Sequence, residues 1–232
     1  MIDCPLFLLA GGFGTRLSKV VSDVPKPLAP VSGKPFLYHL INSYKKQGIS
    51  HFVFLIHHFA DKMRDFIKNE CNKGLLKGSK VEIVEEASPL GTGGSIKNAI
   101  KELNVDGAFL VANADTYLNN GIREVYTAGY PAIACVVVDD VARYGNVQFE
   151  NGLVKSFVEK GNSKGQGFIN SGLYNLHSSI FDNIHQEAFG IEQELFPLLV
   201  KNNHLKAVSI ESDFIDIGIP EDYQKFKDKH EK

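Results

Sequence analysis

Close to its N-terminus the chain reads Leu9-Ala10-Gly11-Gly12-Phe13-Gly14-Thr15-Arg16-Leu17. This glycine-rich stretch follows an apolar run, Leu6–Ala10, that has the length of a buried strand. Glycines there let the backbone approach a ligand closely, and a row of N–H groups can hold phosphate oxygens. Arg16 could add a bidentate, permanently charged contact. The stretch therefore predicts a phosphate-binding loop after a first strand, with a tight turn that binds nothing as the alternative.

Two familiar glycine-rich loops do not fit this spacing. A Walker A loop requires Gly-x-x-x-x-Gly-Lys-Ser/Thr, and no lysine stands at the required place. A dinucleotide fingerprint requires a third glycine at the position that Leu17 occupies. The sequence thus argues against a P-loop NTPase and against an NAD-dependent oxidoreductase.

Apolar runs of strand length alternate with helix-like stretches along the first half of the chain. This rhythm is typical of a largely parallel sheet flanked by helices. The predicted buried strands are Leu6–Ala10, Phe52–His57, Val81–Glu85, Ala108–Asn113 and Ala132–Val138. The predicted helices run from Pro35 to about Gly48, from Ala60 to Asn72, and onward from the glycines after Leu90.

From about Asn146 the pattern changes to short alternating strands. These are Asn146–Phe149, Leu153–Val158 and Phe168–Leu176, and the first two form a hairpin at Glu150-Asn151-Gly152. A helix at Glu192–Asn202, a strand at Lys206–Ile210 and a helix opening with Pro220 complete the chain. We expect a single α/β domain with an inserted or appended mixed-sheet lobe.

Composition limits the class of protein and its surroundings. The 232 residues carry a net charge of -2, which gives no general reason to expect a nucleic acid or an anionic membrane as partner. Cys4, Cys71 and Cys135 are far apart, which indicates a reducing compartment rather than disulfides or zinc. Neither a signal peptide nor a membrane span is evident, so we expect a soluble cytoplasmic protein.

A second motif follows the glycines: Asp23-Val24-Pro25-Lys26-Pro27-Leu28. Prolines on both sides of Lys26 restrict the backbone and predict an extended, stiff stretch. A lysine held in this way could reach back over a triphosphate, whereas an isolated lysine would be a solvated surface residue.

Together, Gly-Gly-x-Gly-Thr-Arg-Leu and Pro-Lys-Pro-Leu resemble the signature of the sugar nucleotidyltransferase superfamily, the nucleoside-diphosphate-sugar pyrophosphorylases. The resemblance implies a Rossmann-like (GT-A-like) α/β fold: a mostly parallel mixed sheet flanked by helices, with a smaller mixed-sheet sugar-binding lobe. Over residues 1–232, residues 1–140 would mainly bind nucleotide and residues 141–232 mainly sugar. It also implies that Arg16 and Lys26 stabilise the reacting phosphates. The residues that would contact the nucleotide at the loop are Leu9, Ala10, Gly11, Gly12, Gly14 and Thr15.

The resemblance extends to base recognition and to a metal. Glu86 and Leu90-Gly91-Thr92-Gly93-Gly94 are similar to the family's base-recognition segment, with Glu86, Gly91 and Thr92 as contacts. Asp115 matches a family magnesium ligand, although Ala114 stands where the family usually has glycine. Asp216, in Asp216-Ile217-Gly218-Ile219-Pro220-Glu221-Asp222-Tyr223, matches the second ligand. Two carboxylates with phosphate oxygens and water suit Mg²⁺.

The sugar-binding elements of the family are matched in order along the second half. They imply that Lys160 neutralises the sugar phosphate and that Glu159 and Asn170 bond hydroxyls. The matching residues are Gly145, Glu159, Lys160, Asn170 and Gly172. Ser171 departs from the family's usual alanine. His57 and His58 lack a carboxylate at ligand spacing and are interpreted as structural.

These motifs imply transfer of a nucleoside monophosphate from an NTP to a sugar 1-phosphate with release of pyrophosphate. The compact layout most resembles the bacterial D-glycero-α-D-manno-heptose 1-phosphate guanylyltransferases, which make GDP-heptose for surface polysaccharide. A hexose-1-phosphate guanylyl- or uridylyltransferase is the first alternative, and a non-catalytic sugar-nucleotide-binding relative is another. The family resemblance also suggests a homodimer.

Overall fold

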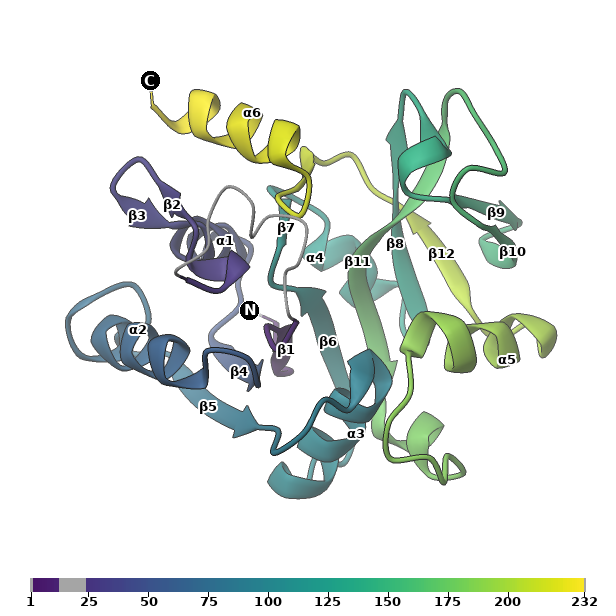
Figure 1. Cartoon of the computed structure of the whole chain (residues 1–232). Coiled ribbons are helices and arrows are strands. Elements are labelled where there is room, and N and C mark those ends of the chain that lie inside the picture. Colours follow the sequence, from purple (N-terminus) through teal and green to yellow (C-terminus); the bar gives the residue numbers. More distant parts are fainter. Residues whose placement is uncertain (1, 13–23, 232) are drawn as a thin grey trace. The chain divides into compact units, whose positions relative to one another are not determined.

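A computed structural model describes residues 2–12 and 24–231 of the chain. Two compact units are present (Figure 1). The first consists of Met1–Pro89, Ala112–Asn119 and Asp213–Lys232, and the second of Leu90–Val111 and Asn120–Ser212. Sheet strands and helices occur in both units, so the predicted α/β class is confirmed.

The sheet of the first unit is parallel and runs in the order β5-β4-β1. Its strands are β1 (Leu6–Leu9), β4 (His51–Ile56) and β5 (Lys80–Glu85). Residues 6–8 and 52–56 are at most 1% exposed. A strand that is buried on both faces requires a nearly continuous apolar sequence. The apolar runs in the sequence therefore predict these strands correctly.

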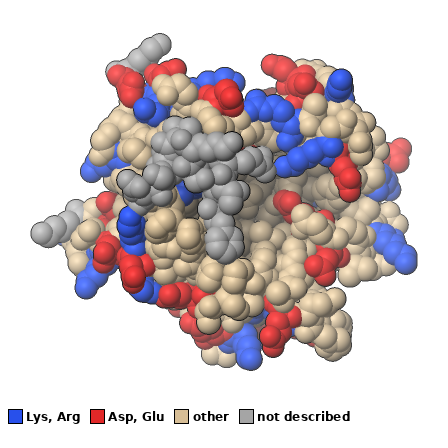
Figure 2. Space-filling view, in the orientation of Figure 1, with Lys and Arg blue, Asp and Glu red and all other residues tan. Residues whose placement is uncertain are grey.

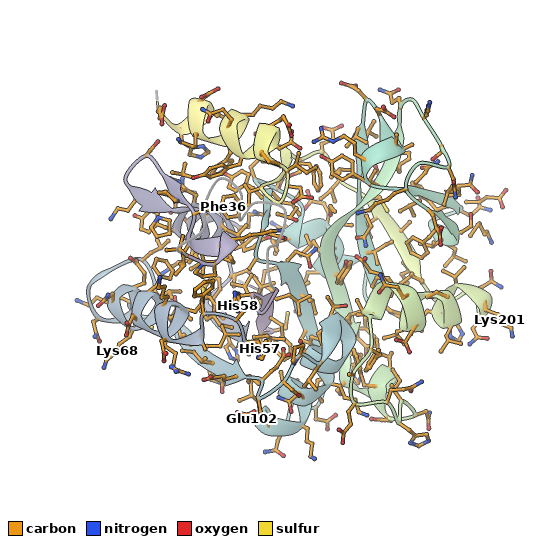
Figure 3. The ribbon with its side chains drawn as sticks, viewed as in Figure 1. Phe36, His57, His58, Lys68, Glu102 and Lys201 are labelled. Atoms are coloured by element: carbon orange, nitrogen blue, oxygen red, sulfur yellow. The ribbon has the colours of Figure 1, made fainter. Side chains whose placement is uncertain are left out.

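The described residues of the first unit form three α-helices: α1 (Phe36–Lys46), α2 (Ala60–Lys73) and α6 (Pro220–His230). Phe36, at the start of α1, is fully buried, whereas Lys68 of α2 is exposed (Figure 3). Pro35, which the sequence analysis placed in the first turn of α1, instead lies one residue before it with extended φ and ψ of -63° and 150°. The predicted helix is confirmed with this shift of its start.

Short elements that the sequence did not reveal complete the first unit. A tight hairpin joins β2 (Pro30–Val31) to β3 (Lys34–Pro35), and a two-stranded antiparallel ladder joins β7 (Thr116–Leu118) to β13 (Phe214–Asp216). Strands of two or three residues are too short to show a periodicity. The β7–β13 ladder is nevertheless decisive for the site, because it brings two distant parts of the chain together.

The sheet of the second unit is mixed and runs in the order β6-β11-β8-β12-β10-β9. Strand β8 pairs in parallel with β12 and antiparallel with β11. The predicted hairpin is confirmed, because β9 and β10 pair antiparallel and Asn151 and Gly152 have φ of 52° and 74°. The strands are β6 (Ala108–Asn113), β8 (Ala132–Val138), β9 (Asn146–Glu150), β10 (Leu153–Val158), β11 (Gly167–His177) and β12 (Lys206–Ser209).

A bulge interrupts β11. The pairing with β8 shifts register between Asn170 and Tyr174, and Gly172 between them has a φ of 76°. Such a bulge re-aims side chains that a regular strand would place elsewhere, and a left-handed backbone there favours glycine.

The helices of the second unit are α3 (Gly91–Leu103), α4 (Ile122–Thr127) and α5 (Phe196–Lys201). Short turns lie at Val141–Arg143 and Ser178–Phe181. The helix predicted over Glu192–Asn202 is split, because its first part, Ile191–Leu195, is a π-helical turn that leads into α5. Such turns occur frequently at functional sites.

Within the described part of the chain, no helix is both long and apolar enough to cross a bilayer. Figure 2 shows Lys and Arg interspersed with Asp and Glu over the face that it presents. This distribution agrees with the small net charge of -2.

Candidate active site

Lys26 and Asp115 form an ion pair in the first unit. Lys26 Nζ lies 3.3 Å from Asp115 Oδ2, and the two side chains are 18% and 34% exposed. Lys26 begins a single 3₁₀ turn, Lys26–Leu28, rather than the extended stretch that the sequence analysis expected. Pro25 is extended, but Pro27 fits the first turn of a helix because its missing N–H is not needed there. The prolines still restrict the backbone that carries the lysine.

A pocket of about 60 Å³ lies at this ion pair. Its walls come from the end of β1, the glycine loop, the 3₁₀ turn and Asp115, the second residue after β6. The lining residues are Leu9, Ala10, Gly12, Lys26, Pro27 and Asp115. Five of these six are residues that the sequence analysis placed at the site, so the fold brings together motifs that are far apart in sequence.

Asp216 reaches the same place through the β7–β13 ladder. It pairs with Thr116, the residue after Asp115, and Ile217 N–H donates to the Asp115 carbonyl over 3.0 Å. Gly218 N–H donates to Asp216 Oδ1 over 2.8 Å. A Cβ at Gly218 would lie 2.8 Å from Asp216 Oδ1 and 2.9 Å from Lys26 Nζ. Both carboxylates and the ammonium group therefore converge on one small region.

This donor set fits a hard divalent cation. Among the described residues no group of three or more His, Cys, Asp or Glu side chains is placed to enclose a metal. Mg²⁺ does not require such a group, because it keeps several waters and is typically bound by one or two carboxylates together with substrate phosphates. Asp115 and Asp216 can supply those carboxylates.

The start of the glycine loop packs closely on the end of β4. A Cβ at Gly11 would lie 3.2 Å from the Cβ of His57. His57, whose place after β4 is seen in Figure 3, donates through Nδ1 to the Glu86 carbonyl over 2.8 Å. Within the described residues the backbone N–H groups of Gly11 and Gly12 have no hydrogen-bond partner. These N–H groups are suited to donate hydrogen bonds to phosphate oxygens.

Glu86 follows β5 in the first unit and is only 6% exposed. The other base-recognition residues, Gly91 and Thr92, belong to the second unit at the start of α3. Arg16, Gly14 and Thr15 lie outside the described residues, so their predicted contacts with phosphate stay predictions.

The glycines at the start of α3 have a packing function. Gly93 and Gly94 N–H groups donate to the Phe189 carbonyl over 2.9 and 3.2 Å, and Ile191 N–H donates to Thr92 Oγ1 over 3.0 Å. A Cβ at Gly93 would lie 2.1 Å from the Phe189 ring. The run of small residues therefore lets a neighbouring segment lie directly on α3, a reason that the sequence did not suggest.

In the second unit Gly145 packs against the end of β10. A Cβ there would lie 2.7 Å from the Val158 carbonyl and 3.6 Å from the Lys160 amide nitrogen, and φ of Gly145 is 85°. Glycine is thus required next to the predicted sugar-binding residues Glu159 and Lys160.

Asn170 sits in a hydrogen-bond network with Tyr174 and Glu192. Its Nδ2 donates to the Tyr174 hydroxyl over 3.0 Å and to Glu192 Oε1 over 2.9 Å, and its Oδ1 accepts from Gly172 N–H over 3.0 Å. The Tyr174 hydroxyl donates to Glu192 Oε1 over 2.8 Å. Burial, followed by the negative charge of Glu192, raises the pKa of Tyr174 well above its usual value, so the hydroxyl remains a donor.

Glu192 and Tyr174 are not among the site residues that the sequence predicts. No local signal connects them to Asn170, because only the bulge in β11 and the turn before α5 bring the three together. Ser171, noted as a departure from the family pattern, is 1% exposed and donates to the Ala134 carbonyl over 3.1 Å. Its hydroxyl is therefore satisfied inside the fold.

Comparison with known proteins now assigns the chain. A family model described as nucleotidyl transferase matches residues 6–232. The chain belongs to the nucleotidyl transferase family. The family predicted from the glycine loop and the Pro-Lys-Pro motif is confirmed, and with it an enzyme of that class.

Curated relatives are similar over nearly the whole chain. D-glycero-alpha-D-manno-heptose 1-phosphate guanylyltransferase of Campylobacter jejuni subsp. jejuni is 36% identical over 222 residues, which is 94% of this chain and 96% of that protein. Probable mannose-1-phosphate guanylyltransferase 1 of Oryza sativa subsp. japonica is 34% identical over 93% of this chain. The match spans only 62% of the rice protein.

Solved structures are also similar over nearly the whole chain. HddC from Yersinia pseudotuberculosis, in a complex with GMP-PN, has a TM-score of 0.86 at 38% identity and covers 97% of this chain and 99% of its own. A putative glucose-1-phosphate thymidylyltransferase from Bacillus anthracis has a TM-score of 0.80 at 18% identity, which shows the fold alone.

Proposed function

We propose that the protein transfers GMP from GTP to D-glycero-α-D-manno-heptose 1-phosphate, giving GDP-heptose and pyrophosphate. The observation that carries the reaction type is the convergence of Lys26, Asp115 and Asp216 beside the glycine loop. The choice of base and sugar is supported by similarity over almost the full length to a heptose 1-phosphate guanylyltransferase.

In the proposed reaction an oxygen of the sugar 1-phosphate attacks the α-phosphorus of GTP, and a new P–O bond forms. The bond between the α-phosphorus and the bridging oxygen breaks, and pyrophosphate leaves with that oxygen. No general base is required, because a phosphate monoester is mostly dianionic above its second pKa of about 6. Positioning and charge stabilisation therefore supply the rate enhancement.

The residues of the first unit have distinct roles in this proposal. The N–H groups of Gly11 and Gly12 hold phosphate oxygens, and Lys26 offsets negative charge on the transferring and leaving phosphates. Asp115 and Asp216 would hold Mg²⁺, which when bound neutralises phosphate charge and orients the α-phosphate. Arg16 is assigned to phosphate binding by its place in the motif.

In the second unit Lys160 is assigned to the phosphate of the sugar substrate, and Glu159 and Asn170 to its hydroxyls. Gly145 allows a close backbone approach beside them, and Gly172 provides a positive φ in β11. Gly91, Thr92 and Glu86 are assigned to the base.

The test is pyrophosphate release with Mg²⁺, for each NTP paired with a panel of sugar 1-phosphates that includes the manno-heptose, mannose and glucose compounds. We expect release with GTP and the heptose. Release with GTP and mannose 1-phosphate would instead identify mannose 1-phosphate as the sugar substrate, in line with the name of the rice relative. Release with UTP would support the uridylyl alternative, and nucleotide binding without release would favour a non-catalytic relative.

We further infer that the protein works in the cytoplasm as a homodimer that supplies GDP-heptose for surface polysaccharide. Cys4, Cys71 and Cys135, which all lie in the described part of the chain, form no disulfide with one another, and this is compatible with a reducing compartment. Light scattering of the purified protein measures its mass in solution, and a monomer there would contradict the dimer.

A further inference from the structure

The side chain of Glu192 is fixed by hydrogen bonds although the residue is exposed. It is the second residue of the π-helical turn Ile191–Leu195 and is exposed. Its Oε1 nevertheless accepts from Asn170 Nδ2 over 2.9 Å and from the Tyr174 hydroxyl over 2.8 Å. Tyr174 itself is only 1% exposed, so one oxygen of Glu192 is fixed to the buried part of the second unit.

The backbone that carries Glu192 is fixed as well. Ile191 N–H donates to Thr92 Oγ1 over 3.0 Å, and the Phe189 carbonyl accepts from Gly93 and Gly94 at the start of α3. The segment therefore joins α3 to β11 within the second unit. A side chain held at both its backbone and its carboxylate has lost most of its conformational entropy before any ligand arrives, which favours binding.

Within the described residues, these hydrogen bonds leave one acceptor atom of Glu192 unused. Both N–H donors of Asn170 are committed inside the protein, to Tyr174 and to Glu192. Among the described residues, Glu192 Oε2 has no hydrogen-bond partner. An ionised carboxylate oxygen accepts up to two hydrogen bonds and donates none. The group that faces solvent is thus a fixed, charged acceptor, whose natural partners are the hydroxyl groups of a sugar.

Aromatic contacts connect this acceptor to the predicted sugar-binding strand. Tyr174 and Phe196 have ring centroids 5.0 Å apart, and Phe196 and Phe157 have centroids 6.2 Å apart. Phe157 lies two residues before Glu159 at the end of β10. The network and the Glu159–Lys160 segment therefore rest on one shared aromatic cluster.

We propose that Glu192 is a specificity-determining residue that accepts hydrogen bonds from hydroxyl groups of the sugar 1-phosphate through Oε2, with Asn170 and Tyr174 as its positioning residues. This inference rests on the proposed function and adds a residue to its sugar site. The opposing interpretation is structural: Glu192 would only stabilise the start of the helical turn, where a negative charge is favourable.

The deciding variant is Glu192→Gln. Its amide oxygen can still accept from Asn170 and Tyr174, whereas its NH₂ group stands where Oε2 stood and can only donate. We expect the KM for the sugar 1-phosphate to rise roughly 10- to 100-fold, the loss of a hydrogen bond to a charged group. The KM for GTP and the melting temperature should stay close to those of the unaltered protein. Glu194→Gln, in the same turn, is the matched control and should leave both KM values unchanged.

Deoxy analogues of the sugar 1-phosphate identify the contact. Removal of the hydroxyl that Glu192 binds should raise the KM of the unaltered protein for the sugar 1-phosphate. The KM of Glu192→Gln should hardly change, so that the KM values of the two proteins converge. Equal KM values for Glu192→Gln and Glu194→Gln would overturn the inference. If Glu192→Gln raised the KM for GTP and the KM for the sugar 1-phosphate equally and also lowered the melting temperature, the structural interpretation would be favoured and the inference overturned. If the unaltered protein turns over no NTP and sugar pair, the proposed function itself fails and the inference fails with it.

Discussion

Asp115 is the single side chain on which most of the proposed chemistry depends. Its ion pair with Lys26 is partly exposed, and pairs of this kind contribute about 0–1 kcal/mol to folding. The free energy of unfolding therefore gains little from the pair, and its position beside the pocket is better explained by phosphate and metal binding.

We expect Asp115→Asn to fold normally and to lose turnover by roughly 100-fold or more, because a neutral amide binds a divalent cation poorly and stabilises no charge. Pyrophosphate release and thermal unfolding measure the two effects. Asp65→Asn, an exposed position on α2, is the control and should behave as the unaltered protein. Near-normal turnover of Asp115→Asn would remove this residue from the site.

Gly218 tests the crowding at the same place. A Cβ there would lie 2.8 Å from Asp216 Oδ1 and 2.9 Å from Lys26 Nζ, closer than real Cβ atoms come. The lysine end can move away cheaply, so Gly218→Ala should cost little stability. The added methyl group should displace the Lys26 ammonium and the Asp216 carboxylate and so lower kcat about tenfold. A misplacement of about 1 Å in an active site can reduce the rate by more than about tenfold. Unchanged steady-state kinetics would show that neither group needs its present position.

At the scale of elements, the start of α3 shows how a glycine run can serve packing. A Cβ at Gly93 would lie 2.1 Å from the ring of Phe189, which is buried. Forcing a methyl group into such a contact typically costs about 1–3 kcal/mol.

We therefore expect Gly93→Ala to lower the free energy of unfolding, measured in urea, by about that amount. In a Phe189→Ala background the clash is absent, and the same change should be neutral or stabilising by up to about 1 kcal/mol, the helix preference of alanine over glycine. Equal losses in both backgrounds would mean that the ring is not what excludes a side chain at Gly93.

The elements that the sequence predicted correctly share one property. Strands such as β1, β4 and β8 are long apolar runs, and α1 carries a stripe of buried residues, so each has a local periodicity. The ladder of β7 and β13 lacks one, since it consists of three-residue strands that acquire their pairing only from each other. Half of the proposed metal site therefore could not be located from local pattern, although the family motif implied Asp216.

For the molecule as a whole, acid is expected to weaken the fold through groups in the first unit. Burial lowers the pKa of His39 from 6.5, opposed by its hydrogen bond to the Val31 carbonyl and reinforced by the charge of His230. Burial raises the pKa of Glu82, but the hydrogen bond from His51 and the charges of Lys80 and His51 outweigh it and lower that pKa overall. In both cases the unfolded chain binds protons more readily than the folded one.

The stability contributed by His39 is therefore present above pH 6.5 and is lost as the pH falls through its folded value. The free energy of unfolding in urea should decrease from pH 7 to pH 5. His39→Gln keeps a donor for the Val31 carbonyl but cannot titrate, so its stability should decrease less over that range. An identical pH dependence in the two proteins would exclude His39 as a contributor.

The sequence by itself determined the family, the buried strands and helices, and the identity of the Lys26, Asp115 and Asp216 motifs. Those features are written in local spacing, where prolines, glycines and apolar periodicity act within a few residues. Only the tertiary structure decided that Asp216 lies beside Asp115 and that Glu192 is tied to Asn170 and Tyr174. Those contacts depend on a ladder between distant segments, a bulge in β11 and the packing of Phe189 on α3, and none of these has a local signal.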